Sequence, residues 1–184
     1  MSWQKEIDEL NKRKSLAKKL GGKEKIERQH KSNRNTIRER ITLFFDKDSF
    51  QEFGMLSGQS DYKETGELEN FLPANSIIGH GLVNDDPVAF YGDDFTVRGG
   101  AADASIWEKM VAAEKLANEY EIPLVRFIEG TGGGGSVKTL EKQGSTYIPF
   151  NPGWDKVIEN LSKIPVISLA LGPVAGLGAA RLVS

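Results

Sequence analysis

The chain has 184 residues, of which 39% are hydrophobic and 27% are charged, a composition typical of a globular protein with one sizeable core. It contains no cysteine and only two histidines, His30 and His80, which excludes disulfide bonds, a thiol nucleophile and a thiolate or histidine-rich metal site. No apolar run approaches about 18 residues, and the N-terminus lacks the apolar core of a signal peptide, so we expect a soluble cytoplasmic protein that uses neither metal nor membrane.

The formal net charge of −2 conceals an asymmetry along the chain. Residues 1–40 contain 13 Lys and Arg against 6 Asp and Glu, whereas the remaining residues contain 11 against 20. Such a basic segment suits a phosphate-bearing ligand, a nucleic acid or docking onto the acidic remainder, or it is a solvated helix face. Trp3, Trp107 and Trp154 are interpreted as helix anchors rather than a base-stacking platform, so we expect no nucleic-acid partner.

The first part of the chain, residues 1–45, is predicted to be a basic helical arm. An apolar stripe at helical spacing predicts an amphipathic helix over 3–20, which ends at a glycine pair. A second short helix is predicted over 34–45. Residues 58–73 are expected to form a polar loop.

From residue 76 onward, short apolar runs alternate with helical periods. The strands SIIGHGLV and VAFYGDDFTV are joined by the turn Asn84–Pro87, and a helix with the capping box Ser105-x-x-Glu108 follows. The strand IPLVRFI, the helix WDKVIENLSK, the strand IPVISLAL and a glycine turn that starts a last helix complete the chain. This alternation predicts an α/β fold over 46–184, with parallel strands joined by crossover helices.

Three of these strands run directly into glycine-rich exits, at 98–100, 130–135 and 172–178. The carboxyl ends of parallel strands share one edge of a sheet, which is where α/β proteins bind ligands. Glycine lets a ligand approach the backbone closely and leaves N–H groups directed at an anion. Tight packing of strand against helix explains any one such exit, but three on one edge favour a site built from backbone amides.

The segment GTGGGG at 130–135 formally matches G-x-G-x-x-G, but the next strand ends in LALGP, without the acid that a dinucleotide ribose needs. The segment also lacks the G-K-[ST] of a phosphate-loop NTPase, which excludes that class. An oxyanion remains the natural ligand, in particular a thioester enolate, whose charged oxygen two N–H groups can hold. If a second substrate brings the base, no side chain need act as one.

Four segments, in this order and at these spacings, resemble the carboxyltransferase (beta) subunits of biotin-dependent acyl-CoA carboxylases: NTIRERITLFFDKDSFQEFG, DDFTVRGGAA, IPLVRFIEGTGGGG and IPVISLALGPVAGLGAA. Propionyl-CoA, methylcrotonyl-CoA and geranyl-CoA carboxylases belong to that family, and the sodium-pump decarboxylases are relatives. The resemblance covers about residues 30–184. It implies a crotonase-like (ClpP/crotonase) layered fold, in which 46–184 form a truncated first domain of two.

The resemblance implies transfer of a carboxyl group from carboxybiotin to the α or γ carbon of an acyl-CoA through a thioester enolate. Biotin is then carried by a partner, a biotin carboxylase or biotin carrier subunit. The full subunit is expected to form homo-oligomers in the bacterial cytosol or, in a eukaryote, the mitochondrial matrix. Because the family's active site lies between domains of two subunits, this chain alone is expected to bind acyl-CoA weakly and not to carboxylate it.

The resemblance also implies site residues. The oxyanion hole for the thioester falls on the backbone N–H groups of Gly176 and Leu177, where leucine replaces the family's second glycine. The family's turn of the DSGGAR type corresponds to EGTGGGG, with Gly135 in place of its arginine. Contacts to the substrate or to CoA are expected from Gly99, Gly100, Thr131, Gly132, Gly133, Arg98, Arg38 and Arg40. For the last two arginines, the alternative is ion pairs that lock the arm onto the acidic body.

Two other functions stay open. A crotonase-type hydratase or isomerase needs a carboxylate acid/base, for which Glu129 and Glu141 are the candidates. A non-catalytic assembly fragment would pack against a partner through the basic arm. His80 is interpreted as a packed residue. Asp93 and Asp94 are neighbours on a strand and point to opposite faces, so they cannot converge on one proton.

Overall fold

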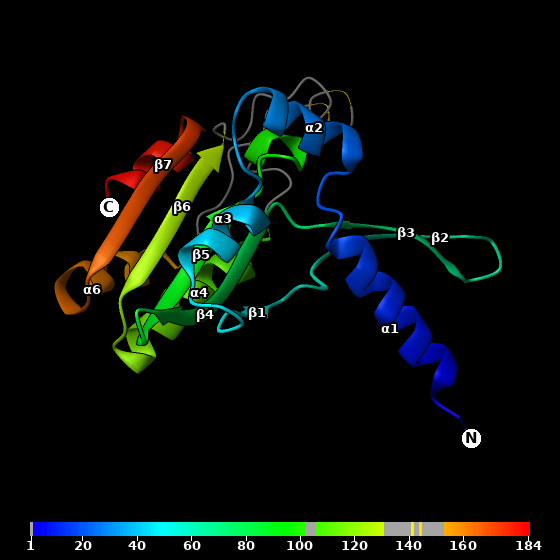
Figure 1. The fold of residues 1–184 in the computed structure, drawn as a ribbon, viewed down its shortest axis with the longest axis horizontal. Helices are drawn as coiled ribbons and strands as arrows, with labels where there is room; N and C mark the ends of the chain where they lie inside the picture. The colour runs from blue at the N-terminus through cyan, green and yellow to red at the C-terminus, as the bar shows by residue number, and fades with distance from the viewer. Residues whose placement is uncertain (1, 102–105, 131–140, 142–143, 145–152) are drawn as a thin grey trace.

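The computed structural model describes residues 2–101, 106–130, 141, 144 and 153–184. Its main sheet has the strand order β1-β4-β5-β6-β7 (Figure 1). These strands are β1 (Gln51–Phe53), β4 (Ser76–Val83), β5 (Asp86–Asp93), β6 (Leu124–Gly130) and β7 (Val166–Val174). The first three pair antiparallel, whereas β5, β6 and β7 pair in parallel. The predicted parallel α/β arrangement is therefore confirmed for these last three strands.

Helices separate the parallel strands in the chain, as expected. Helix α4 (Trp107–Tyr120) lies between β5 and β6, α6 (Trp154–Lys163) between β6 and β7, and α7 (Leu177–Leu182) follows β7. The bounds of α6 are those predicted from its sequence. The predicted start of α4 is wrong by one residue: its N-cap is Ile106, which offers no capping side chain, and Ser105 lies outside the described residues.

The N-terminal arm contains three helices, α1 (Gln4–Ala17), α2 (Lys23–Lys31) and α3 (Ile37–Phe44). The first ends sooner than the predicted residue 20, and α2 was not predicted, because its sequence KEKIERQHK contains a single apolar residue. Helix α3 begins with a capping box in which Thr36 and Glu39 exchange hydrogen bonds.

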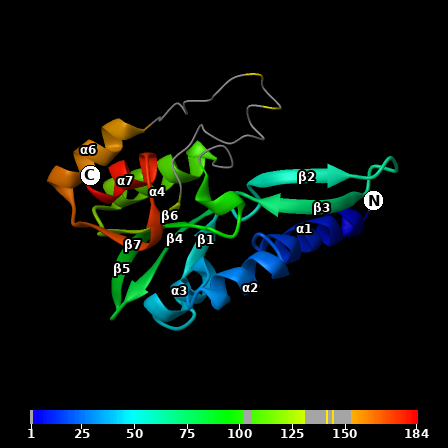
Figure 2. The same ribbon diagram turned by 90° about the horizontal axis from the view of Figure 1, so that it is seen from above.

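The predicted polar loop at 58–73 is wrong, because this segment forms the antiparallel hairpin of β2 (Gly58–Tyr62) and β3 (Leu68–Pro73). The hairpin and α1 lie side by side and project from the body (Figures 1 and 2). The guanidinium of Arg13 donates to Oγ of Ser60 at 2.7 Å. The polar side chains of the hairpin thus face solvent or α1, which hides the strand pattern in the sequence.

The core lies on both faces of the sheet. Helix α3 covers one face and α4 the other (Figure 2). Under α3, the ring of Phe90 packs edge-on against Phe127 at 5.0 Å and Phe45 at 5.5 Å. Strand β6 is buried along its whole length. A domain boundary at residue 45 stays a prediction, although α3 shares its core with the sheet. Among the helices in the described ranges, none is long and apolar enough to cross a membrane.

Candidate functional site

The glycine exits of β5, β6 and β7 meet at one edge of the sheet. The exit of β5 is the short helix η1 (Arg98–Gly100). A Cβ built on Gly100 would lie 2.5 Å from the carbonyl oxygen of Glu129 and 2.8 Å from Cα of Gly130. The backbone N–H of Ala175 donates to the carbonyl of Gly130 at 3.0 Å. The three backbones are therefore in direct contact, as the topology of a parallel sheet predicts.

The turn between β7 and α7 contains the two residues expected to form an oxyanion hole. Gly176 has φ 57° and ψ −125°, a conformation that favours glycine, and it is the N-cap of α7. Leu177 opens the helix, so geometry leaves its N–H without a partner inside α7. Gly176 is exposed and Leu177 is half-buried. Both residues are thus accessible to solvent at the edge where the exits meet.

The carboxylate of Glu129, at the end of β6, holds the N-terminal arm against this edge. It is 1% exposed and accepts hydrogen bonds from Nε2 of Gln29 at 3.0 Å, from Arg34 at 3.0 Å and from Arg40 at 2.5 Å. Arg40 also donates to the carbonyl of Leu171 at 3.0 Å. Arg40 therefore forms an ion pair between the arm and the body, which is the alternative to a contact with CoA. A carboxylate occupied by these donors is poorly suited to the acid/base role of a hydratase.

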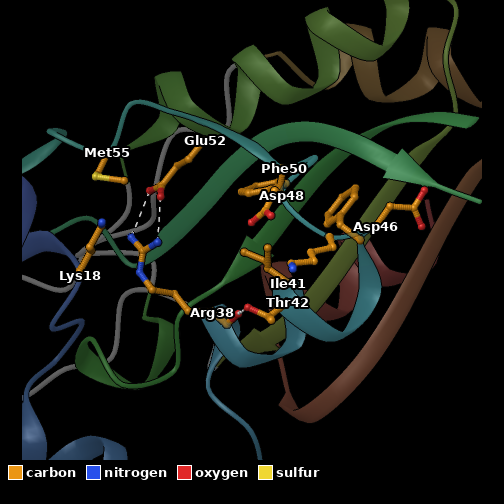
Figure 3. Close-up of a pocket in the computed structure, with 11 residues that line it drawn as sticks. Lys18, Arg38, Ile41, Thr42, Asp46, Asp48, Phe50, Glu52 and Met55 are labelled. Atoms are coloured by element: carbon orange, nitrogen blue, oxygen red, sulfur yellow. Dashed lines mark hydrogen bonds and ion pairs between the residues drawn. The ribbon is translucent and has the colours of Figure 1, made fainter. Parts of the chain in front are cut away.

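Arg38 lies elsewhere, although it is only two residues from Arg40. Its guanidinium donates to both carboxylate oxygens of Glu52 in β1, at 2.8 and 3.3 Å. The pair lines a pocket of about 930 Å³ between α3 and β1, in which Figure 3 shows Arg38 directed at Glu52 and Lys18 close by. The pocket has an apolar floor that includes Ile41 and Phe50. Arg98 is not among the residues that line this pocket, so the pocket does not bring Arg38 together with Arg98.

Arg98 and Gly99 line a hollow of about 320 Å³ between η1 and the arm. The other residues around it are Lys25, Arg28, Gln29, Arg34, Phe95 and Thr96. Four of its lining side chains are cations, and the guanidinium of Arg34 stacks over the ring of Phe95 at 5.3 Å. The positive charge of residues 1–40 was visible in the sequence as a signal, but nothing in the sequence located these arm residues beside the first glycine exit.

Asp93, which is half-buried, and Lys109, which is buried, have shifted pKa values. Burial raises the pKa of Asp93 to about 6, and the hydroxyl of Tyr91 donates to it at 2.5 Å. Asp94, which follows the last residue of β5, instead accepts hydrogen bonds from Thr96, so the two aspartates have different partners. Burial lowers the pKa of Lys109 to about 8, and its amino group donates to the carbonyl of Ser76 at 2.5 Å.

Some predicted residues cannot be placed. Thr131, Gly132 and Gly133 lie outside the described residues. Glu141 is described and exposed, but its neighbours in the chain are not. Within the described ranges, no group of three or more His, Cys, Asp or Glu could hold a metal ion.

The model of the carboxyl transferase domain family matches residues 28–180. The carboxyltransferase subunit of propionyl-CoA carboxylase from Haloferax mediterranei is 30% identical over 177 residues, covering 96% of this chain and 33% of that protein. Subunit alpha of methylmalonyl-CoA decarboxylase from Propionigenium modestum is 32% identical over 177 residues, covering 94% of this chain and 32% of that protein. The chain thus spans about a third of the length of these curated relatives.

A solved structure of transcarboxylase 12S, with methylmalonyl-coenzyme A and methylmalonic acid bound, has a TM-score of 0.75 to this chain at 22% identity. The match covers 99% of this chain and 35% of that one. A single-chain, multi-domain long-chain acyl-CoA carboxylase has a TM-score of 0.68 at 20% identity, covering 96% of this chain and 18% of that one. These likenesses confirm the predicted crotonase-like α/β fold.

Proposed function

The chain belongs to the carboxyl transferase domain family, and from this premise we propose that it is the N-terminal part of a carboxyltransferase subunit of a biotin-dependent acyl-CoA carboxylase. The observation that carries the proposal is the contact between the glycine exits, with a cationic hollow beside the first and the turn of Gly176 beside the third. One edge thereby offers donors for an anionic tail and donors for a thioester oxygen.

In this proposal, the hollow beside η1 receives phosphate oxygens of coenzyme A. Lys25 and Arg28 project from α2, and Arg34 and Arg98 complete the lining. Arginine and lysine both bind phosphate well, and a hydrogen bond to a charged group contributes about 1.5–3 kcal/mol. The acyl-CoA would then run from the hollow along the glycine exits toward Leu177.

The backbone N–H groups of Gly176 and Leu177 would hold the thioester oxygen as it becomes an enolate oxygen. Donors fixed in advance at the site of developing charge stabilise the transition state at little reorganisation cost. Carboxybiotin, carried on a partner subunit, would supply the carboxyl group as CO2 and a nitrogen base for the proton of the acyl-CoA. Such an external base suits this edge, since the carboxylates of Glu129 and Asp93 are both occupied by internal hydrogen bonds.

The remaining features of the proposal follow from the same premise. The complete subunit would form a homo-oligomer and work with a biotin carboxylase or a biotin carrier in the cytosol or the mitochondrial matrix. Residues 1–184 by themselves would bind acyl-CoA weakly and transfer no carboxyl group. Purified protein that carboxylates acyl-CoA when only these residues are present would contradict the last point.

The proposal is tested by measuring binding of CoA and of propionyl-CoA by calorimetry. The double variant Lys25→Ala/Arg28→Ala should raise the Kd of both ligands at least about tenfold, because charged contacts to phosphate are lost. Lys23→Ala is the matched control, since Lys23 is an exposed cation of the same helix and does not line the hollow. Absence of CoA binding by the full-length protein, or equal weakening by the control, would overturn the assignment.

A further inference from the structure

We infer that Arg40 and Glu129 are positioning residues for the turn that carries Gly176 and Leu177. The guanidinium of Arg40 donates to Oε2 of Glu129 at 2.5 Å through one nitrogen and to the carbonyl of Leu171 at 3.0 Å through another. One planar guanidinium therefore joins α3 in the arm, the end of β6 and the residue of β7 that directly precedes its exit. This inference rests on the proposed function, because it assigns this guanidinium a task in thioester binding.

The end of β7 is held at two points, one just before its glycine exit and one within it. At the first, Arg40 binds the carbonyl of Leu171. At the second, the N–H of Ala175 donates to the carbonyl of Gly130 at 3.0 Å. The amides of Gly176 and Leu177 follow directly after Ala175. Their position relative to the sheet therefore depends on both hydrogen bonds. Of these two hydrogen bonds, only the one from Arg40 to Leu171 involves a side chain, so it can be changed by mutation.

Glu129 contacts both the exit of β7 and strand β5. Its carboxylate packs directly against Gly172, where an added Cβ would clash with Oε1. Its backbone N–H donates to Asp93 at 3.0 Å, which fixes β6 against β5. The position of the carboxylate is therefore fixed by several contacts. Because it packs against Gly172, a change in its position should also move Gly172.

Arg34 provides an internal comparison. It also pairs with Glu129, at 3.0 Å, but it belongs to the segment between α2 and α3, and within the described ranges it does not share the hydrogen bond that Arg40 makes to Leu171 of β7. A fork of the arginine type fixes two acceptors in one plane, whereas a lysine ammonium is a point charge on a flexible stem. Replacing either arginine by lysine preserves the charge beside Glu129. Only the replacement at position 40 removes the link to Leu171.

The experiment compares two ligands in the purified full-length protein. One is propionyl-CoA, and the other is S-propyl-CoA, in which a methylene replaces the thioester carbonyl. The ratio of their Kd values reports the hydrogen bonds to the thioester oxygen, because the CoA portions are identical. Arg40→Lys should reduce the preference for the thioester by about five- to tenfold, as expected when one hydrogen bond is lost, and leave the Kd of S-propyl-CoA within about twofold. Arg34→Lys should keep the preference.

Gly172→Ala is a second variant. Its added Cβ would clash with the carboxylate of Glu129 and displace it, so this variant should lower the same ratio. It provides the test if Arg40→Lys does not fold. A wild-type preference that survives both Arg40→Lys and Gly172→Ala would overturn the inference. So would an equal loss in Arg34→Lys and Arg40→Lys, since the link to Leu171 would then be irrelevant. A wild-type protein without any thioester preference would instead refute the proposed oxyanion hole, and the inference with it.

Discussion

Asp93 and Tyr91 share a short hydrogen bond inside the protein, in which the tyrosine hydroxyl donates to Oδ1 at 2.5 Å. The second carboxylate oxygen of Asp93 accepts the backbone N–H of Glu129 at 3.0 Å, so this side chain ties β5 to the end of β6. Burial raises the pKa of Asp93 to about 6, because the charged form is poorly solvated there. The proton of Asp93 is therefore linked to folding.

We predict that Asp93 makes the free energy of unfolding fall as the pH rises from about 4 to about 6. In this range the Asp93 carboxyl of the folded protein retains a proton. The same carboxyl in the unfolded chain, with a pKa of about 3.9, has released it. Asp93→Asn has the same shape and does not titrate, so it should lose this contribution, which is at most about 1.4 kcal/mol per pH unit. Urea unfolding between about pH 4 and 7 measures the slopes. Asp86→Asn, at an exposed position of the same strand, should keep the wild-type slope.

Lys109 should produce a dependence in the alkaline range. Burial lowers the pKa of Lys109 to about 8, so between about 8 and about 10.4 the unfolded chain holds a proton that the folded protein has lost. The free energy of unfolding should therefore rise with pH across this window. Lys109→Met should abolish the rise, whereas Lys115→Met, at an exposed position of the same helix, should not. An unchanged slope in Lys109→Met would show that this amine titrates normally.

Local sequence patterns predicted the elements that are bounded by strong signals. Helix α6 was predicted to the residue, because WDKVIENLSK starts after Gly153 and ends before a proline at 165. Helix α2 and the hairpin of β2 and β3 were missed, since both are polar and depend on distant contacts. Gln29 of α2, for example, binds Glu129, which lies 100 residues away in the chain. No local pattern records such a partner.

The candidate site also has one part that could be predicted from the sequence and one part that could not. Its backbone part was predictable, because the parallel topology places the exits of β5, β6 and β7 on one edge and glycine permits their contact. Its side-chain part depends on the path of the arm. The sequence could not show that Arg34 and Arg98 line one hollow, nor that Arg38 and Arg40 bind acids on different strands.

The contact between the first two exits can be tested at Gly100. Gly100→Ala introduces a Cβ that would lie 2.5 Å from the carbonyl oxygen of Glu129, at a residue with φ 65°. Gly66→Ala is the matched control, since Gly66 has φ 80° and no atom within 4 Å of the added Cβ. The control should lose about 1 kcal/mol of stability through the left-handed backbone alone. Gly100→Ala should lose about 1–3 kcal/mol more, because the backbones must move apart. Equal losses in urea unfolding would contradict the close contact.

The ion pair between Arg126 and Glu114 should be critical for stability. Arg126 is 0% exposed, its guanidinium lies 2.9 Å from the carboxylate of Glu114, and it also donates to the carbonyl of Arg181 at 3.2 Å, which joins β6, α4 and α7. Arg126→Met should lower the free energy of unfolding by about 3–5 kcal/mol, because a buried carboxylate loses its main counter-charge. The exposed pair of Lys23 and Glu27, at 3.8 Å, supplies the control, since Lys23→Ala should cost less than about 1 kcal/mol. Urea unfolding of both variants at neutral pH decides the question: a loss in Arg126→Met as small as that of the control would mean that Arg181, 3.4 Å from the same carboxylate, compensates the charge by itself.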